Sequence, residues 1–474
     1  MSIEQLGEAV LACRAAAQTD SLAVALDLTL VEPAAEAALF EVLGLARARD
    51  GEMPSRSLAN FHQSCAVRFN ALLKTDPASA IQLATMVGVF AHECRHIHDL
   101  RLTRTGAELL LMELRAYNDT PQLLKALRNW QARNPERKIR YPLTSKELAD
   151  MELPADIVDG WRAALAHRNS ASGLWAKRSA FRAFPGTSIR DLFEMLGFVV
   201  QMDVILCLFG EQAASMVSTS MTTAVQHDYL RPAHQLFTLC QARGKPLPAP
   251  LDLSSLALDA LTVTSISESF KSDGKTTGRH PGAWFDRFAE VYCTVPPDLH
   301  PNPLARPMQT VDCVLKREGK PDALYLIQET SDWLDAEMLR IGPELVASTN
   351  RGAGAAVLML TEIPIDFRTM QRAVRQHQQY HTPVGYLELL LTGALLSVYV
   401  AVNTRHGRFD FRTPSDTPAN HIGASRIAME SAKQTRRLAA GLAGDADFLD
   451  EAMLELMLAQ PPDGMGLRLR LKVE

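Results

Sequence analysis

The chain has few cysteines for its length, and none of them stands close to another. Seven are spread over 474 residues, and no two form a C-x-x-C pair. An odd number of isolated cysteines argues against a disulfide framework. A reducing compartment fits this usage, and we expect a cytoplasmic protein.

A surplus of charge of one sign is missing too. The formal net charge is −5, which gives no electrostatic reason to expect nucleic acid as a partner. Glu4 and Glu8 precede the first apolar stretch, where a signal peptide would carry basic residues. We therefore predict neither a nucleic-acid partner nor a secretory leader.

Long uninterrupted apolar runs are also absent. Residues 193–209 are very apolar but contain Glu194, Gln201 and Asp203, and residues 387–402 are short for a membrane span. We expect a buried helix at each place, the second one running into a strand, and no membrane contact. Apolar residues make up 47% of the chain and charged residues 22%, the balance of a soluble protein with a large core and two or three domains.

One motif dominates what is present. His92, Glu93, Cys94, Arg95 and His96 spell H-E-x-x-H within a stretch that reads as a long helix. Asp76 followed by Pro77 is a natural helix start, an N-cap residue and then proline at the first helical position. Residues four apart lie on the same helix face, so both imidazoles can reach one metal ion. Glu93 lies beside that face, where a carboxylate can accept a proton from water.

These residues resemble the motif of the zincin metallopeptidases over about residues 76–118. The resemblance implies that His92 and His96 bind zinc and that Glu93 is the general base. Arg95 is charged where the family prefers an uncharged residue, and we expect its long side chain to reach solvent. His98 stands where a hydrophobic residue is usual, points away from the metal face, and is not expected to be a ligand.

Gly88 lies one turn before His92 on the same side of the helix. We expect it to leave open space above the metal. Asp99 and Leu102 occupy the places where the metzincin subtype needs glycine and a third histidine, so that subtype is excluded.

The third ligand is predicted from the next helix, as in the gluzincin subtype. Glu113 has apolar helical neighbours, and a buried lone carboxylate is costly unless it is paired or bound to metal. Glu113 also begins a segment that resembles the E-x-x-A-x ligand segment of gluzincins. Thr105 and Glu108 read as a capping box, which makes Glu108 the poorer candidate ligand.

Two further residues have alternative interpretations. Asp99 can orient a ligand imidazole, or it can pair with Arg95 or Arg101. Tyr117 can donate a hydrogen bond to an oxyanion, or it can be a packed aromatic side chain.

We expect an α+β, predominantly helical fold: a small sheet followed by the metal-binding helix, then a large helical region with a few C-terminal strands. The predicted domains are a zincin-like core over 1–125, a helical region over 126–245 and a mixed, mainly helical domain over 246–474. The proline-rich stretch 244–250 is the preferred boundary. The elements expected around the motif are a helix over 1–20, a strand over 22–30, a strand or short helix over 38–45, helices over 60–74 and 188–210, and strands over 397–402 and 408–412.

The function predicted from the sequence is that of a zinc-dependent hydrolase of gluzincin type, a peptidase acting on a peptide or protein. The alternative is a catalytically inactive zincin-like or helical interaction protein. A non-haem iron protein uses the same ligand types, and Glu93 beside the first histidine favours zinc hydrolysis over it. The sequence gives no prediction of substrate specificity or oligomeric state.

Overall fold

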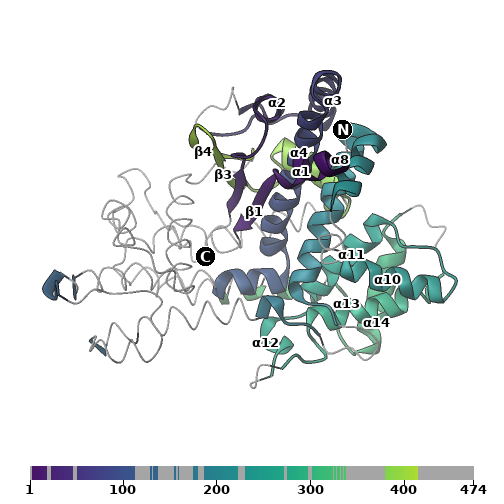
Figure 1. Ribbon diagram of the computed structural model, residues 1–474. Coiled ribbons are helices and arrows are strands. Elements are labelled where there is room, and N and C mark those ends of the chain that lie inside the picture. Colours follow the sequence, from purple (N-terminus) through teal and green to yellow (C-terminus); the bar gives the residue numbers. More distant parts are fainter. Residues whose placement is uncertain are drawn as a thin grey trace. The chain divides into compact units, whose positions relative to one another are not determined.

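A computed structural model gives the arrangement of the chain (Figure 1). It describes residues 3–18, 23–45, 51–112, 174–179, 186–221, 230–271, 275–296, 302–337 with four single-residue gaps, and 379–414, and a few residues between 129 and 159. Contacts divide the chain into two units. The first consists of Met1–Glu108, Trp175–Asp332 and Asp366–Ala419, and the second of Leu109–Leu174, Trp333–Ile365 and Asn420–Glu474. The elements described below belong to the first unit.

The sheet joins the beginning of the chain to its C-terminal part. Its four strands follow the order β1 (Arg14–Gln18), β2 (Ala23–Asp27), β3 (Tyr399–Thr404) and β4 (Gly407–Arg412). The outer pairs are antiparallel, whereas β2 and β3 run parallel with Val24 opposite Val400. The strands predicted over 22–30, 397–402 and 408–412 are therefore confirmed.

This pairing bears on the predicted domains. The predicted domains, 1–125, 126–245 and 246–474, follow one another along the chain. The first unit contains elements from all three ranges. The reason is that β2 and β3 share backbone hydrogen bonds although the metal-binding helix and most of the chain lie between them. Residues 244–249 form a loop between two helices of the same unit rather than a link between units.

Two predicted elements near the N-terminus need correction. The helix expected over 1–20 ends early: α1 spans Ile3–Leu11, and the chain then forms β1. Within the segment 38–45, residues 38–43 belong to α2 (Pro33–Leu43), which begins at a proline and is followed by Gly44 in the left-handed conformation, with φ 72°. The helix alternative for that segment is the right one, because Pro33 at a helix start and glycine past its end are strong boundary signals.

The H-E-x-x-H motif lies on α4 (Pro77–Leu102), which follows α3 (Leu58–Thr75). Asp76 caps α4 by accepting a hydrogen bond from the backbone N–H of Ser79, and Pro77 occupies the first turn, as the sequence predicted. Most side chains of α4 are buried all around the helix, which marks a central helix rather than a surface one. The motif is therefore carried by the core of the unit.

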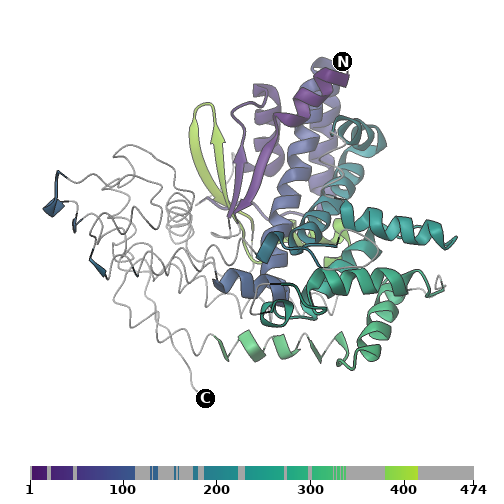
Figure 2. The same ribbon diagram turned by 60° about the horizontal axis from the view of Figure 1, so that its bottom comes forward.

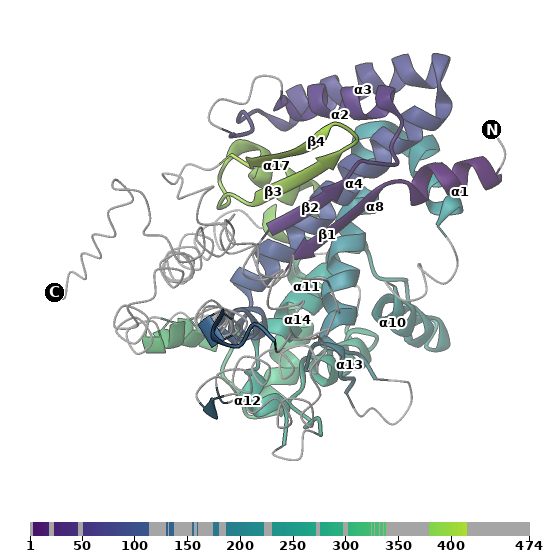
Figure 3. The same ribbon diagram turned by 60° about the vertical axis from the view of Figure 1, so that its left-hand side comes forward.

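The partner of α4 is α8 (Ile189–Ser220), the apolar helix predicted over 188–210. Its N-cap Ser188 and Asp191 form a capping box, and Gly210 interrupts the helix with φ 83°. By length and composition α8 could cross a membrane, but 72% of its most apolar window is buried inside the protein. The views of Figures 1 and 3 show α4 and α8 side by side in the middle of the unit.

Further helices cover this pair. They are α10 (Arg231–Ala242), α11 (Pro250–Thr262), α12 (Ile266–Ser269), α13 (Pro281–Tyr292), α14 (Ala305–Arg317), the 3-10 turn η2 (Gln379–His381) and α17 (Pro383–Thr392). The helices α10, α11, α13 and α17 contact α8. Figure 2 shows the strands on one side of α4 and the helical group on the other. As predicted for residues 387–402, α17 leads into β3, and the described part of the chain is predominantly helical with one small mixed sheet.

Candidate metal centre

Three possible metal ligands converge where α4 faces α8. His92 and His96 come from α4 and Glu194 comes from α8, and their ligand atoms all lie within 4.8 Å of one another. The two Nε2 atoms are 2.9 Å apart, and each lies 3.6 Å from Oε2 of Glu194. We call these three residues the His–Glu cluster. It can hold a metal ion.

The spacing within the His–Glu cluster suits a small tetrahedral ion. Ligands about 2.0–2.1 Å from zinc stand roughly 3.3–3.4 Å apart at the corners of a tetrahedron. The three separations in the cluster, 2.9, 3.6 and 3.6 Å, bracket that value. Two imidazoles and one carboxylate are also a donor set that zinc accepts. The residues therefore fit the ion that the motif implies.

Gln201 fixes the orientation of one ligand. Nδ1 of His92 lies 3.0 Å from Oε1 of Gln201, one turn further along α8 than Gly197. When Nδ1–H donates to that oxygen, the lone pair of His92 is on Nε2, the atom that faces His96 and Glu194. Gln201 thus selects the tautomer that can bind metal.

Two glycines allow α4 and α8 to approach. A Cβ atom added to Gly197 would lie 2.6 Å from Cδ2 and Nε2 of His92, so only glycine leaves room for this ring. A Cβ added to Gly88 would lie 2.7 Å from Cδ1 of Ile205. The expectation that Gly88 leaves open space above the metal is wrong, because the side chain of Ile205 fills that space.

Charge within the His–Glu cluster is balanced between the two helices. Burial alone would raise the pKa of Glu194, but its hydrogen bonds with His92 and His96 and their charges outweigh burial and hold its pKa well below the usual range. Burial lowers the pKa of His96, yet Glu194 and the nearby Glu93 and Asp99 raise it on balance. Glu194 is thus a charged carboxylate paired with the two imidazoles, and a bound cation would take over that pairing.

The predicted third ligand cannot be placed. Glu113 and Tyr117 lie outside the described residues. Glu108, the second choice, forms an ion pair with Arg104 and accepts a hydrogen bond from the backbone N–H of Ile266, so its carboxylate is engaged away from the cluster.

The capping box predicted at Thr105 is wrong. The helix that follows α4 is capped by Thr103, whose Oγ1 accepts a hydrogen bond from the N–H of Gly106 at 3.1 Å. The hydroxyl of Thr105 donates instead to the carbonyl of Thr264. The helix starts two residues earlier than expected because Thr103 is itself a good N-cap residue.

The sequence did not predict Glu194 as a possible metal ligand. Glu194 entered the predictions only as a charge that argues against a membrane span. The same argument that favoured Glu113 applies to it: its carboxylate interrupts a strongly apolar, buried helix, where a lone carboxylate is costly. Gly197 and Gln201 follow on the same face, one and two turns later. This pattern was the available signal.

Arg95 and Asp99 form a network with residues outside the His–Glu cluster. Arg95 was expected to reach solvent, but it is 1% exposed, and its Nε lies 2.9 Å from Oδ1 of Asp99. It also donates to the carbonyl of Tyr380 and stacks on the rings of Tyr380 and Tyr386. The hydroxyl of Tyr380 donates to Asp99 at 2.6 Å.

Asp99 therefore follows the pairing alternative, with Arg95 as its partner, although the pair is buried. The Nδ1 atom of His96, which Asp99 would have to orient, has no hydrogen-bond partner among the described residues. His98 lies outside the His–Glu cluster, as predicted. Its Nδ1 is 2.9 Å from the hydroxyl of Tyr386, and its Nε2 is 2.9 Å from the carbonyl oxygen of Leu396.

Glu93 and Cys94 lie between the two histidines on α4. Glu93 is half-buried, whereas Cys94 is fully buried and burial raises its thiol pKa well above the ordinary value. Cys94 is thus a packed residue, and Glu93 is only partly buried.

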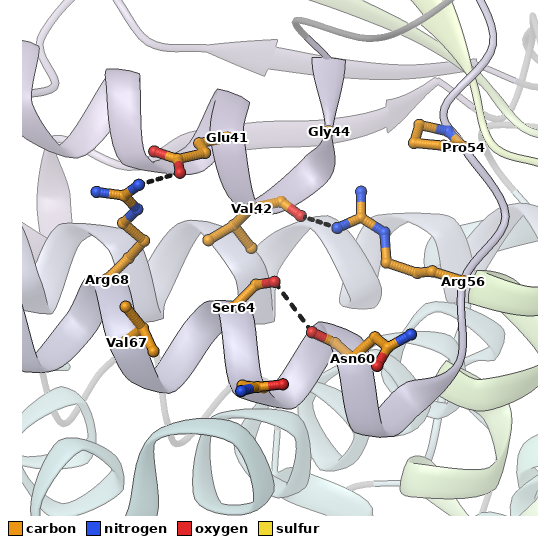
Figure 4. Close-up of a pocket in the computed structure, with 10 residues that line it drawn as sticks. Glu41, Val42, Gly44, Pro54, Arg56, Asn60, Ser64, Val67 and Arg68 are labelled. Atoms are coloured by element: carbon orange, nitrogen blue, oxygen red, sulfur yellow. Dashed lines mark hydrogen bonds and ion pairs between the residues drawn. The ribbon is translucent and has the colours of Figure 1, made fainter.

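A cavity of about 530 Å³ lies elsewhere, between the end of α2, α3 and the segment around Pro54 (Figure 4). Arg56 donates to the carbonyl of Val42, and Arg68 pairs with Glu41 across it. No member of the His–Glu cluster lines this cavity. We therefore assign it no part in the chemistry of the cluster.

Comparisons with known proteins add no relative. No protein-family model matches the chain, and no curated protein or solved structure matches it at a significant level. Function must therefore be argued from the site itself.

Proposed function

We propose that this protein is a zinc-dependent hydrolase, a peptidase, in which His92, His96 and Glu194 hold the metal and Glu93 is the general base. The observation that carries the proposal is the convergence of Glu194 on both histidines of an H-E-x-x-H motif, from a helix about a hundred residues away in sequence. A zinc site of this kind needs a third protein ligand, and the carboxylate of Glu194 lies at a suitable distance from both histidines. This argues against a chance occurrence of the H-E-x-x-H motif.

Each residue has a defined task in this proposal. Bound by two imidazoles and a carboxylate, zinc acts as a Lewis acid that activates water and polarises a carbonyl at neutral pH. Gln201 keeps the lone pair of His92 directed into the cluster. Glu93 accepts a proton from the attacking water and passes it to the leaving amine, the role of a general base that then serves as general acid.

Zinc is preferred to iron on the same residues. Two histidines and one carboxylate also form the ligand set of non-haem iron oxygenases. A carboxylate directly after the first histidine has no task in that chemistry, whereas peptide hydrolysis needs a proton acceptor there. The position of Glu93 therefore supports hydrolysis.

The first test is the metal content of the purified protein by elemental analysis. Wild type is expected to bind about one zinc per chain, and His96→Ala and Glu194→Ala are expected to lose it. Glu211→Ala, an exposed carboxylate on the same helix α8, is the matched control and should keep zinc. Glu113→Ala belongs in the series: zinc lost there but retained in Glu194→Ala would move the third ligand to Glu113.

The second test separates an enzyme from an inactive zincin-like interaction protein. Glu93→Gln should keep its zinc and lose peptide hydrolysis by a factor on the order of 10²–10⁴, the usual contribution of a general base. The result that favours the interaction protein has two parts. Wild type would bind zinc but cleave no member of a broad peptide library, and Glu93→Gln would match wild type in every binding assay. Absence of zinc in wild type even after zinc is added would contradict the enzyme and leave a helical interaction protein.

A further inference from the structure

Two buried cysteines meet outside the His–Glu cluster. Cys240 is in the last turn of α10, and Cys293 follows the end of α13 (Figure 3). Their Sγ atoms are 3.1 Å apart, although 53 residues separate them in sequence, and both thiols are free and no more than 1% exposed. A shift of about 1 Å would bring the sulfurs to the length of a disulfide bond.

The surrounding contacts hold these two helix ends together. Arg243, just after α10, donates to the carbonyl of Glu290 on α13. Arg306 on α14 donates to both the hydroxyl and the carbonyl of Tyr292, the residue before Cys293. These hydrogen bonds hold the two helix ends, and with them the two thiols, opposite each other, so that only a small movement is needed to reach disulfide geometry.

We propose that Cys240 and Cys293 form an intramolecular disulfide when the protein meets a small disulfide oxidant such as oxidised glutathione. One cysteine thiolate attacks the glutathione disulfide, forms a mixed disulfide and releases one glutathione. The other thiolate then attacks the protein sulfur of the mixed disulfide and releases the second glutathione. The protein loses two electrons, glutathione disulfide gains them, and the two thiol protons end on the two glutathione molecules.

Burial makes this reaction slow rather than unfavourable. Burial and the hydrogen bond with Cys240 raise the pKa of the Cys293 thiol, so little thiolate is present in the closed structure. The oxidant must wait for a local opening of the helix end. We therefore expect the fraction of disulfide to reach its equilibrium with the glutathione buffer only after long exposure.

The bond would reinforce the support of α8. Gln235 on α10 and Thr187, next to the N-cap of α8, both donate to Oδ1 of Asp286 on α13, each at 2.9 Å. A disulfide between α10 and α13 would therefore stabilise the contacts that hold the N-terminal end of α8, the helix that carries Glu194.

The test uses the full chain, refolded and equilibrated in glutathione buffers of increasing oxidised fraction, then alkylated and mapped by mass spectrometry. Wild type is expected to lose two of its seven thiols and to yield one linked peptide pair that joins Cys240 to Cys293. Cys313→Ser, a half-buried cysteine on α14, should give the same linked pair. Cys240→Ser and Cys293→Ser should give none, and the oxidised wild type alone should gain several degrees in Tm.

The mapping of wild type decides the matter even if a serine variant does not fold. Both thiols alkylated at equilibrium in fully oxidised buffer, or either one linked to another cysteine, would overturn the proposal. Because the readout is a covalent bond, it is independent of zinc and of any peptidase activity.

Discussion

Arg95 lies inside the H-E-x-x-H motif, but its contacts are with residues outside the His–Glu cluster. Its guanidinium is clamped by Asp99, by the carbonyl of Tyr380 and by two tyrosine rings. A buried charge of this kind is tolerated only when its partner is present, because an isolated buried charge is very costly. The motif therefore contains a structural residue beside those for which we propose a catalytic role.

Replacing Arg95 by Leu leaves the side chain of Asp99 buried, with Tyr380 as its remaining donor among the described residues. We expect the free energy of unfolding to fall by about 3–5 kcal/mol, the usual cost of breaking a buried pair. Urea unfolding followed by circular dichroism measures this. Arg190→Leu, which removes an exposed arginine on α8, should change stability by less than about 1 kcal/mol. Equal effects of the two variants would contradict the role of Arg95.

Asp286 gives a prediction for pH. Burial raises its pKa to about 6, and the hydrogen bonds from Thr187, Ser179 and Gln235 counter only part of that. In the unfolded chain an Asp titrates near 4, so between about pH 4 and 6 the folded state binds more protons than the unfolded state. This contribution to stability is full below pH 4 and is lost as the pH rises through 6.

The check compares wild type with Asp286→Asn by urea unfolding between pH 4 and 8. As the pH rises from 4 through 6, wild type should lose about 2–3 kcal/mol of unfolding free energy relative to Asp286→Asn. At higher pH the difference between the two proteins should stay constant. A difference that does not change with pH would show that Asp286 titrates normally.

At the scale of elements, the His–Glu cluster depends on how closely α4 and α8 pack. Gly197→Ala should weaken zinc binding by roughly 10–100-fold, the range typical of disturbed ligand orientation, because the new Cβ would overlap the ring of His92. Competition with a chromogenic chelator measures the affinity. Gly7→Ala on α1, where a Cβ meets nothing within 4 Å, is the matched control and should leave affinity unchanged.

The same helix pair shows what the sequence could predict. The start of α4, the shared face of His92 and His96 and the apolar character of α8 follow from local spacing and capping, and all were predicted. The meeting of Glu194 with the histidines was not, because it depends on which two helices pack and at what register, and no local pattern encodes that. Arg95 was misplaced for the same reason: its partners, Tyr380 and Tyr386, are far away in sequence.

At the scale of the whole molecule, the helix that carries the H-E-x-x-H motif depends on residues from the C-terminal part of the chain. Val400 of β3 is fully buried and pairs with Val24 of β2. Val400→Asp should lower the free energy of unfolding by several kcal/mol, since it buries an unpaired carboxylate, and should reduce zinc content. His406→Asp, in the exposed turn between β3 and β4, should do neither. Full zinc content in Val400→Asp would show that the cluster forms without the sheet.

The parallel pairing of β2 with β3 also sets an order in time. Arg405 donates to the carbonyl of Thr29, which was synthesised 376 residues earlier. At about 5–20 residues per second, roughly 20–75 s of translation separate the two. For most of that interval the motif of α4 has been synthesised, but Tyr380, Tyr386 and β3 have not. We expect a nascent chain to be unable to act as a hydrolase until β3 and β4 emerge, so that synthesis itself delays the onset of the proposed activity.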